Sequence, residues 1–296
     1  MWKLIALAAV LAGLAALFAW RRRRIELAFR RAIDRRPKAP NGVVVGAEGF
    51  VLERPGAPGV LLLHGAGDTP QTLRYLADEL HRRGFHVSAP LLPGHGRDLD
   101  AFARVTAREI VGAARTTFDQ LRANHEWVGL IGLSMGGAVA VQLAADTANL
   151  PALGLAAPYL AMPPRIARAA SLAWLWGPLA PVVRSADGIS VFDADERARS
   201  LAYGVFTPSA LRALAEIVRS AAAALPRVAA PTLFLQSRTD NRISVSAAER
   251  AFARLGSAEK RLEWISGAAH IITVDYGRDQ VNAALASWME AHRISR

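Results

Sequence analysis

The sequence of 296 residues predicts an α/β fold in which a mostly parallel sheet carries helices on both faces. Two observations predict it. Short runs that are apolar throughout, such as residues 60–63 and 127–133, alternate with helical stretches. Strands alternating with helices of about 10–15 residues are typical of crossover connections, and uniformly apolar strands are buried on both faces. The second observation is a glycine-rich turn at residues 132–137, which joins one such strand to a helix.

The elements follow one another without an internal repeat up to residue 157. We expect a starting hairpin, then strands and helices in alternation. The predicted strands are residues 43–45 and 50–52 (the hairpin), 60–63, 86–92, 127–133, 153–157, 231–236 and 261–265, and the predicted helices are 70–83, 103–124 and 137–147.

Residues 132–136, Gly-Leu-Ser-Met-Gly, lie where the apolar run 127–133 meets the predicted helix 137–147. A G-x-S-x-G pattern carries a mechanism only where a strand precedes it and a helix follows it, and both conditions are met here. So tight a turn needs glycines beside the serine, and it lifts the hydroxyl clear of the sheet. The pattern predicts Ser134 as a nucleophile. The alternative is a glycine-rich connection without chemistry.

A serine hydroxyl is a weak nucleophile, so a base and an orienting acid should follow it in the order Ser, Asp, His. Asp240 follows the predicted strand 231–236, and His270 follows the predicted edge strand 261–265. Both therefore lie at the carboxyl ends of strands, where open α/β sheets place their sites. We expect His270 to accept the proton of Ser134 and Asp240 to fix the imidazole tautomer. Singly, each is compatible with an ordinary loop residue.

A further loop, residues 64–67 (His-Gly-Ala-Gly), follows the strand 60–63 directly. The second donor of an oxyanion hole belongs there, supplied by a backbone N–H. We expect the Ala66 and Met135 amides to form the pair. His64 is expected to support the loop rather than perform chemistry. The alternative is a simple glycine turn that leads into the next helix.

In these motifs the chain resembles the α/β-hydrolases, in particular their carboxylesterase and monoacylglycerol lipase branch. The resemblance extends over about residues 42–296 and rests on residues 61–65, 90–96, 132–137, 237–240 and 270–275. It implies an α/β-hydrolase fold with a small cap insertion, and cleavage of carboxylic esters through an acyl-serine. It implies no cofactor and no metal. Asp275 belongs to the last of these motifs and is the other candidate for the acid.

The chain departs from the family pattern at two positions. Ala66 stands where many bacterial relatives carry an aromatic residue. Since a backbone N–H would do the work, we expect activity to survive and the acyl pocket to differ in shape. The glycine that commonly precedes the acid is absent before Asp240.

The alternation of strands and helices fails between residue 158 and about residue 225, a stretch with several prolines and an apolar helical piece at 166–176. Relatives insert a cap over the site at this point of the chain. Trp174 and Trp176 are expected to provide apolar walls for an acyl chain. The alternative is that both tryptophans only pack the cap against the sheet.

The basic charge of the chain is local. The formal net charge is +11, but residues 1–38 contain ten basic and two acidic residues, which leaves +3 for residues 39–296. A folded domain with that balance has no general electrostatic reason to bind nucleic acid. The absence of cysteine excludes disulfides, thiolate metal sites and a lipoprotein anchor.

Residues 4–20 are seventeen apolar residues without charge. As a helix they span roughly 26 Å, near the short limit for a bilayer core. Trp2 and Trp20 stand at the two ends, as interfacial anchors do. A cleaved signal peptide is the alternative, although the positive charge of residues 21–24 lies on the wrong side for one. The positive-inside rule places the amino terminus outside and the enzyme in the cytoplasm.

Beyond the arginines, Ile25, Phe29, Ala32 and Ile33 recur at helical spacing among basic residues. This pattern suggests a basic amphipathic helix lying on anionic headgroups. The alternative is a solvated charged linker. The predicted organisation is an anchor at residues 1–24, a basic juxtamembrane linker at 25–39 and a hydrolase domain at 40–296, with the cap at about 158–225.

The sequence therefore predicts a membrane-anchored serine carboxylesterase that acts on small or amphiphilic acyl esters, monoacylglycerols among them. A thioesterase or an acyltransferase would use the same three residues. A ligand-binding protein with little turnover is the alternative from another class, but it has no need of all three. The sequence leaves acyl length, alcohol group and oligomeric state open.

Overall fold

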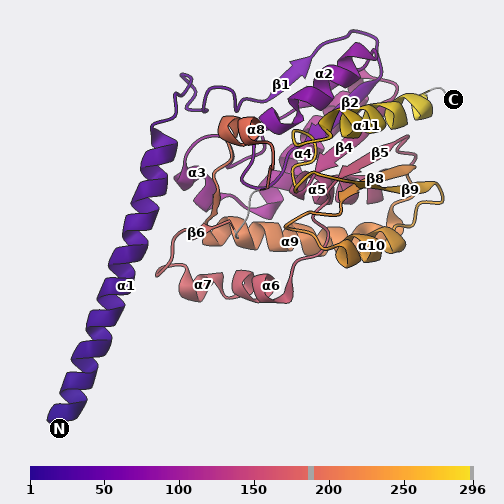
Figure 1. Cartoon of the computed structure of the whole chain (residues 1–296). Coiled ribbons are helices and arrows are strands. Elements are labelled where there is room, and N and C mark those ends of the chain that lie inside the picture. The colour runs from indigo at the N-terminus through magenta and orange to yellow at the C-terminus, as the bar shows by residue number, and fades with distance from the viewer. Residues whose placement is uncertain (186–189, 294–296) are drawn as a thin grey trace.

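The computed structural model, which describes residues 1–185 and 190–293, is built around a seven-stranded sheet (Figure 1). The strand order is β1-β3-β2-β4-β5-β8-β9, and only β1 runs antiparallel to its neighbour. The predicted, mostly parallel sheet is confirmed. Its strands are β1 (Phe50–Leu52), β2 (Gly59–Leu63), β3 (His86–Ala89), β4 (Val128–Leu133), β5 (Leu153–Ala156), β8 (Thr232–Ser237) and β9 (Lys260–Ile265).

Helices cover both faces of the sheet, because successive side chains of each buried strand point to opposite sides. In β2, Val60 and Leu62 pack into one cluster of buried residues, and Leu61 and Leu63 pack into the other. The first cluster includes α2 (Arg74–Arg82), which follows the 3₁₀ turn η1 (Pro70–Leu73), and α11 (Arg278–Arg293). The second includes α4 (Ala107–Asn124), α5 (Met135–Ala145), α9 (Pro208–Ala224) and α10 (Val245–Arg254).

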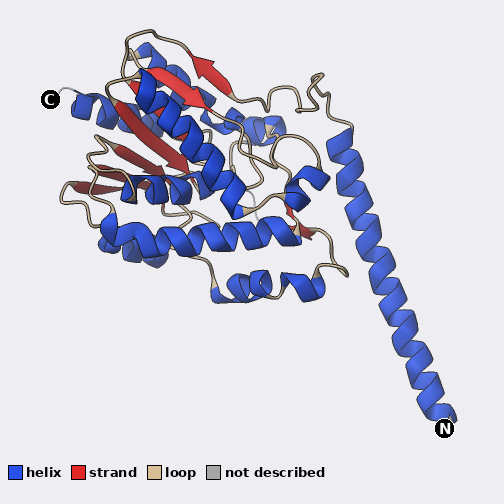
Figure 2. Cartoon of the chain, turned by 180° about the vertical axis from the view of Figure 1, so that it is seen from behind, coloured by secondary structure: helices blue, strands red, loops and turns tan. Residues whose placement is uncertain are grey.

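Between β5 and β8 the chain forms small elements and then the long helix α9, which packs against α5 and ends in the 3₁₀ turn η2 (Leu225–Arg227). Both α6 and α7 contact α9 and lie on its far side from the sheet (Figures 1 and 2). The small elements are α6 (Pro164–Ser171), α7 (Ala173–Trp176), α8 (Ala194–Arg199) and the antiparallel pair β6 (Val183–Arg184) and β7 (Val205–Phe206).

The N-terminal helix α1 (Trp2–Asp34) projects from the domain (Figure 1). Within the described residues it is the one helix long and apolar enough to cross a membrane, and a signal sequence would meet the same criterion. Its last third docks on the domain, where Ile33 is buried and Ile25 and Phe29 pack against the core. Arg30 pairs with Asp100 at 2.7 Å. Of the apolar stripe expected to lie on headgroups, Ile25, Phe29 and Ile33 therefore pack on the hydrolase domain, whereas Ala32 is exposed.

Two local predictions are wrong. Residues 43–45 are all described and form no strand, only an isolated bridge from Val44 to Lys38, so β1 pairs with β3 instead of closing a hairpin. The helix expected at 103–124 is divided into α3 (Leu99–Arg104) and α4, because Thr106 caps α4 in a capping box with Glu109.

Candidate active site

Ser134 lies on the turn between β4 and α5, with φ of +54° and ψ of −117°. A non-glycine residue at positive φ is strained, and such residues cluster at functional sites. The turn is crowded on both sides of the serine. A Cβ added to Gly136 would lie 2.0 Å from the carbonyl oxygen of Leu63, and one added to Gly132 would lie 2.3 Å from that of Gly136. Glycine is therefore required at both positions.

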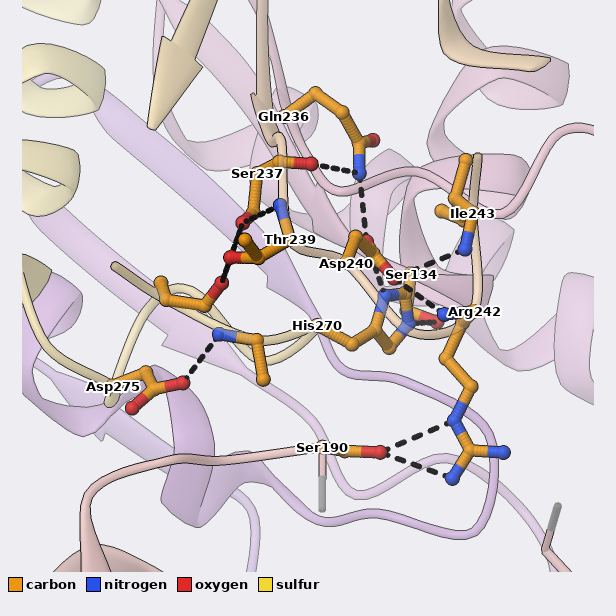
Figure 3. Close-up of polar contacts among 12 residues, drawn as sticks. Ser134, Ser190, Gln236, Ser237, Thr239, Asp240, Arg242, Ile243, His270 and Asp275 are labelled. Atoms are coloured by element: carbon orange, nitrogen blue, oxygen red, sulfur yellow. Dashed lines mark hydrogen bonds and ion pairs between the residues drawn. The ribbon is translucent and has the colours of Figure 1, made fainter. Parts of the chain in front are cut away.

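The structure brings Ser134, His270 and Asp240 into one hydrogen-bonded line (Figure 3). The Ser134 Oγ lies 2.8 Å from Nε2 of His270, and Nδ1 of His270 lies 2.8 Å from Oδ2 of Asp240. His270 is almost fully buried, and the Asp240 side chain is completely so. All three follow the carboxyl ends of strands, as the sequence predicts.

Four donors surround the Asp240 carboxylate. Oδ1 accepts the backbone N–H groups of Arg242 at 2.7 Å and Ile243 at 3.0 Å, and Oδ2 accepts Nε2 of Gln236 at 2.7 Å as well as His270. Burial opposes ionisation, but the charge and hydrogen bond of His270 and the backbone donors outweigh it and lower the pKa of Asp240. An ionised Asp240 holds the proton of His270 on Nδ1. The Nε2 atom is then free to accept from Ser134.

The loop expected to complete the oxyanion hole lies against Ser134. A Cβ added to Gly65 would be 3.3 Å from the Cβ of Ser134, and Ala66 lines the same cavity as Ser134. Met135 is the first residue of α5, where backbone N–H groups have no partner within the helix. The two backbone amides chosen from the sequence thus belong to two segments that meet at Ser134.

Two buried histidines support this loop. His64 Nε2 accepts the backbone N–H of Leu92 at 3.0 Å, so its Nδ1 carries the proton and donates to the carbonyl oxygen of Gly65 at 2.9 Å. Burial lowers the pKa of His64 well below its ordinary value and lowers that of His95 to about 4. Both rings are therefore neutral, and neither lies between Ser134 and His270.

A cavity of about 990 Å³ opens from Ser134 and His270. Trp176 lines it, and its Nε1 donates to the carbonyl oxygen of Ala169 at 2.7 Å. Trp174 lies outside this cavity: it is 67% exposed and borders a separate cavity of about 280 Å³. Of the two tryptophans expected to form the acyl wall, the structure places only Trp176 beside the site.

Sequence reasoning missed two polar residues of the site. Gln236 is a buried polar residue that follows three apolar residues of its strand, which was a signal for a specific partner, and that partner is Asp240. Asp68 ends the loop that begins at His64; its Oδ2 accepts from Thr72 Oγ1 at 2.8 Å, and burial raises its pKa to about 6. No group of three or more potential metal ligands occurs among the described residues.

A doubly covered parallel sheet with a strained serine after a central strand, and with an acid and a histidine after later strands, defines an α/β-hydrolase. The family model described as "Serine aminopeptidase, S33" (Hydrolase_4) matches residues 57–276, and the chain belongs to this family.

Named relatives agree with this assignment. The chain is 27% identical over 242 residues to the thermostable monoacylglycerol lipase of Bacillus sp. (strain H-257), covering 81% of this chain and 92% of the relative. It is 23% identical over 237 residues to the carboxylesterase of Bacillus subtilis (strain 168), covering 79% and 93%. The chain is a carboxylic ester hydrolase of the lipase and esterase type.

Solved structures show the same fold. A structure reported for the metagenome-derived lipolytic enzymes LipS and LipT matches with a TM-score of 0.76 and 26% identity, covering 86% of this chain and all of that one. The monoacylglycerol lipase of Paleococcus ferrophilus matches with a TM-score of 0.72 and 22% identity, covering 82% and 98%.

Proposed function

We propose that this protein hydrolyses small or amphiphilic acyl esters through an acyl-enzyme on Ser134. The observation that carries the proposal is the continuous line from the Ser134 hydroxyl through His270 to Asp240, with 2.8 Å at each step. Geometry of this kind activates a hydroxyl that is otherwise a weak nucleophile.

The reaction has two halves. His270 Nε2 takes the proton as Ser134 Oγ bonds to the carbonyl carbon, and the Ala66 and Met135 amides donate to the oxyanion. His270 then protonates the leaving alcohol as the ester C–O bond breaks. In the second half, water gives its proton to His270 and attacks the acyl carbon, and Ser134 recovers its proton as the acid leaves. No step calls for a metal or cofactor.

Single-chain acyl esters, monoacylglycerols among them, are the substrate class that we favour. A relative of the chain is named a monoacylglycerol lipase, and the cavity is large enough for a single acyl chain. The apolar part of α1 supports retention in a membrane, where such amphiphiles concentrate. By the positive-inside rule the arginines at 21–24 favour a catalytic domain in the cytoplasm.

A fluorophosphonate probe tests the mechanism. It should label Ser134 with one equivalent, and Ser134→Ala should abolish both labelling and hydrolysis across esters from acetyl to palmitoyl. Label on another serine, or hydrolysis at the wild-type rate by the variant, would overturn the mechanism. Matched thioesters in the same assay distinguish a thioesterase, and added alcohol acceptors distinguish an acyltransferase.

Membrane attachment is tested separately. The full chain should remain with membranes through alkaline carbonate extraction, and a carboxyl-terminal reporter should be active only if it works in the cytoplasm. An intact mass lacking the first twenty or so residues would instead reveal a cleaved signal peptide. Activity of a periplasmic reporter would reverse the orientation.

A further inference from the structure

The membrane helix contributes side chains to the active-site cavity. Phe18 and Arg22 of α1 line the same cavity as Ser134 and His270. They are one helical turn apart and share a face of α1, with the Arg22 guanidinium 5.0 Å from the centre of the Phe18 ring. The cavity is therefore bounded by the catalytic loops at one end and by α1 at the other.

α1 meets the cavity at the junction between its apolar stretch and its run of arginines. Phe18 belongs to the apolar stretch 4–20, and Arg22 belongs to the arginine run 21–24 that follows it. Where a membrane helix passes from apolar residues to arginines, it leaves the hydrocarbon and enters the headgroup layer. With α1 in a bilayer, the cavity would border the membrane at this depth.

Positive charge predominates in the lining. Among the residues that the structure describes, two carboxylates lie there, Asp68 and Glu196, and Glu196 accepts hydrogen bonds from Tyr75 and Arg199. The five arginines of the lining are Arg22, Arg165, Arg184, Arg197 and Arg242.

Four of these arginines, Arg22, Arg165, Arg184 and Arg197, form no ion pair with any carboxylate in the part of the chain that the structure describes, and Arg197 donates instead to backbone carbonyl oxygens. Arg184 lies over the ring of Phe29, so the cap and α1 meet beside the cavity. Guanidinium groups bind phosphate and carboxylate oxygens through paired N–H donors.

We propose that α1 is a wall of the substrate cavity as well as an anchor, and that it selects single-chain acyl esters that carry an anionic group. Phe18 contacts the hydrocarbon part of the substrate, and Arg22 with Arg184 binds the phosphate or carboxylate at the membrane surface. The proposal rests on the ester hydrolysis proposed above and adds the substrate class and the residues of α1 that recognise it.

The test uses the full chain in lipid nanodiscs and three substrates with one acyl chain: a monoacylglycerol, its phosphate monoester and its carboxymethyl ether. Arg22→Ala should lower kcat/KM by about tenfold on the anionic esters, the loss expected for a charge-assisted contact, and by less than about twofold on the neutral one. Raising the salt concentration should weaken the same preference in the wild type. A loss on only one of the two anionic esters would identify phosphate or carboxylate as the group bound.

Matched controls lie on α1 itself. Arg23→Ala removes the same charge from a residue outside the cavity lining and should leave the preference unchanged. Phe18→Ala should reduce hydrolysis of long-chain esters of every headgroup, whereas Leu17→Ala should not. Equal effects of Arg22→Ala and Arg23→Ala, or of Phe18→Ala and Leu17→Ala, would overturn the proposal. Even if these controls fail, the proposed ester hydrolysis would still hold if the protein hydrolyses acetyl esters and Ser134→Ala abolishes that activity.

Discussion

The carboxylate of Asp275 accepts the backbone N–H of Ala269, the residue before His270, at 2.6 Å. The same carboxylate accepts the N–H groups of Phe192, Asp193 and Tyr276 at 2.9 Å. Asp275 therefore holds the histidine loop to the segment that opens α8, but within the described part of the chain it forms no hydrogen bond with the imidazole of His270. Asp240 alone of the two carboxylates touches His270.

Replacing each acid by its amide should separate these roles. Asp240→Asn should lower kcat by about 10⁴, because the imidazole loses the partner that fixes its tautomer. It should also lower the free energy of unfolding by about 1–3 kcal/mol, because this buried carboxylate accepts two backbone N–H groups. Asp275→Asn puts an amide among backbone donors and should lower the free energy of unfolding by about 1–3 kcal/mol, with a smaller effect on kcat. Steady-state kinetics and thermal unfolding of both variants check this. If Asp275→Asn were the crippling change, the assignment of the acid would be wrong.

The strain at Ser134 predicts that two inactive variants, Ser134→Gly and Ser134→Ala, differ in stability. Ser134→Gly removes the Cβ that is unfavourable at φ of +54°, whereas Ser134→Ala keeps it. Relief of strain is worth about 1–3 kcal/mol and exceeds the extra chain entropy that glycine loses on folding, about 0.5–1 kcal/mol. The glycine variant should therefore unfold at a higher temperature than the alanine variant. Identical unfolding curves would mean that the elbow stores no strain.

The hydrogen-bonded arrangement of Ser134, His270 and Asp240 was predictable from the sequence because its geometry follows from sheet topology. Neighbouring parallel strands end at one edge of a sheet, so residues placed after β4, β8 and β9 converge although 136 positions separate Ser134 from His270. Glycine spacing identified the elbow for a similar reason, since the backbone of the turn leaves no room for a side chain.

Tertiary partners were not predictable in the same way. The helical spacing of Ile25, Phe29 and Ile33 predicts that this face of α1 contacts apolar groups. The spacing does not indicate whether those groups belong to lipid or, as in the structure, to the protein core. Trp174 and Trp176 are two residues apart and so point in different directions from one short helical segment. Which of them faces the site depends on how α7 packs against α9.

The end of α1 that packs on the hydrolase domain is expected to stabilise the folded protein, although it lies outside the hydrolase motifs. Ile33 is 1% exposed within the main core cluster, so Ile33→Ala should lower the free energy of unfolding by about 2–4 kcal/mol. Leu27→Ala removes a similar volume from a residue that is 40% exposed on the same helix, and it should cost less than about 1 kcal/mol. Denaturant unfolding of the full chain in detergent measures both. Equal losses would mean that α1 does not dock as described.

Asp68 predicts a pH-dependent stability. Its pKa is about 6 in the folded protein because burial disfavours the charge, against about 3.9 in an unfolded chain. The folded state therefore holds the proton more tightly, and this contribution to stability is complete below about pH 4 and is lost as the pH rises through 6. Asp68→Asn is neutral throughout, so its stability relative to wild type should grow between about pH 3 and pH 8 by up to about 3 kcal/mol.

Thermal unfolding at several pH values measures this difference. The exposed Asp119 offers the matched control, and Asp119→Asn should show a constant difference from wild type over the same range. A constant difference for Asp68→Asn as well would show that its carboxyl group titrates as it does in the unfolded chain.

The placement of the tryptophans predicts a change in acyl-length dependence. Each methylene that passes from water to an apolar wall contributes at most about 0.8 kcal/mol, or roughly fourfold in kcat/KM, until the cavity is full. Trp176 lines the cavity, so Trp176→Ala should flatten the rise of kcat/KM with acyl length and leave acetyl esters nearly unchanged.

Trp174→Ala removes the same side chain two positions away, outside that cavity, and should leave the length profile as in the wild type. Trp176 Nε1 also donates to the carbonyl oxygen of Ala169, so Trp176→Ala removes a structural hydrogen bond as well as the apolar wall. The two effects must be told apart. A structural effect would reduce kcat/KM equally at every acyl length, whereas loss of an acyl wall changes the slope. An equal reduction for Trp176→Ala would therefore assign this tryptophan to the packing of α6 against α7 and not to the substrate.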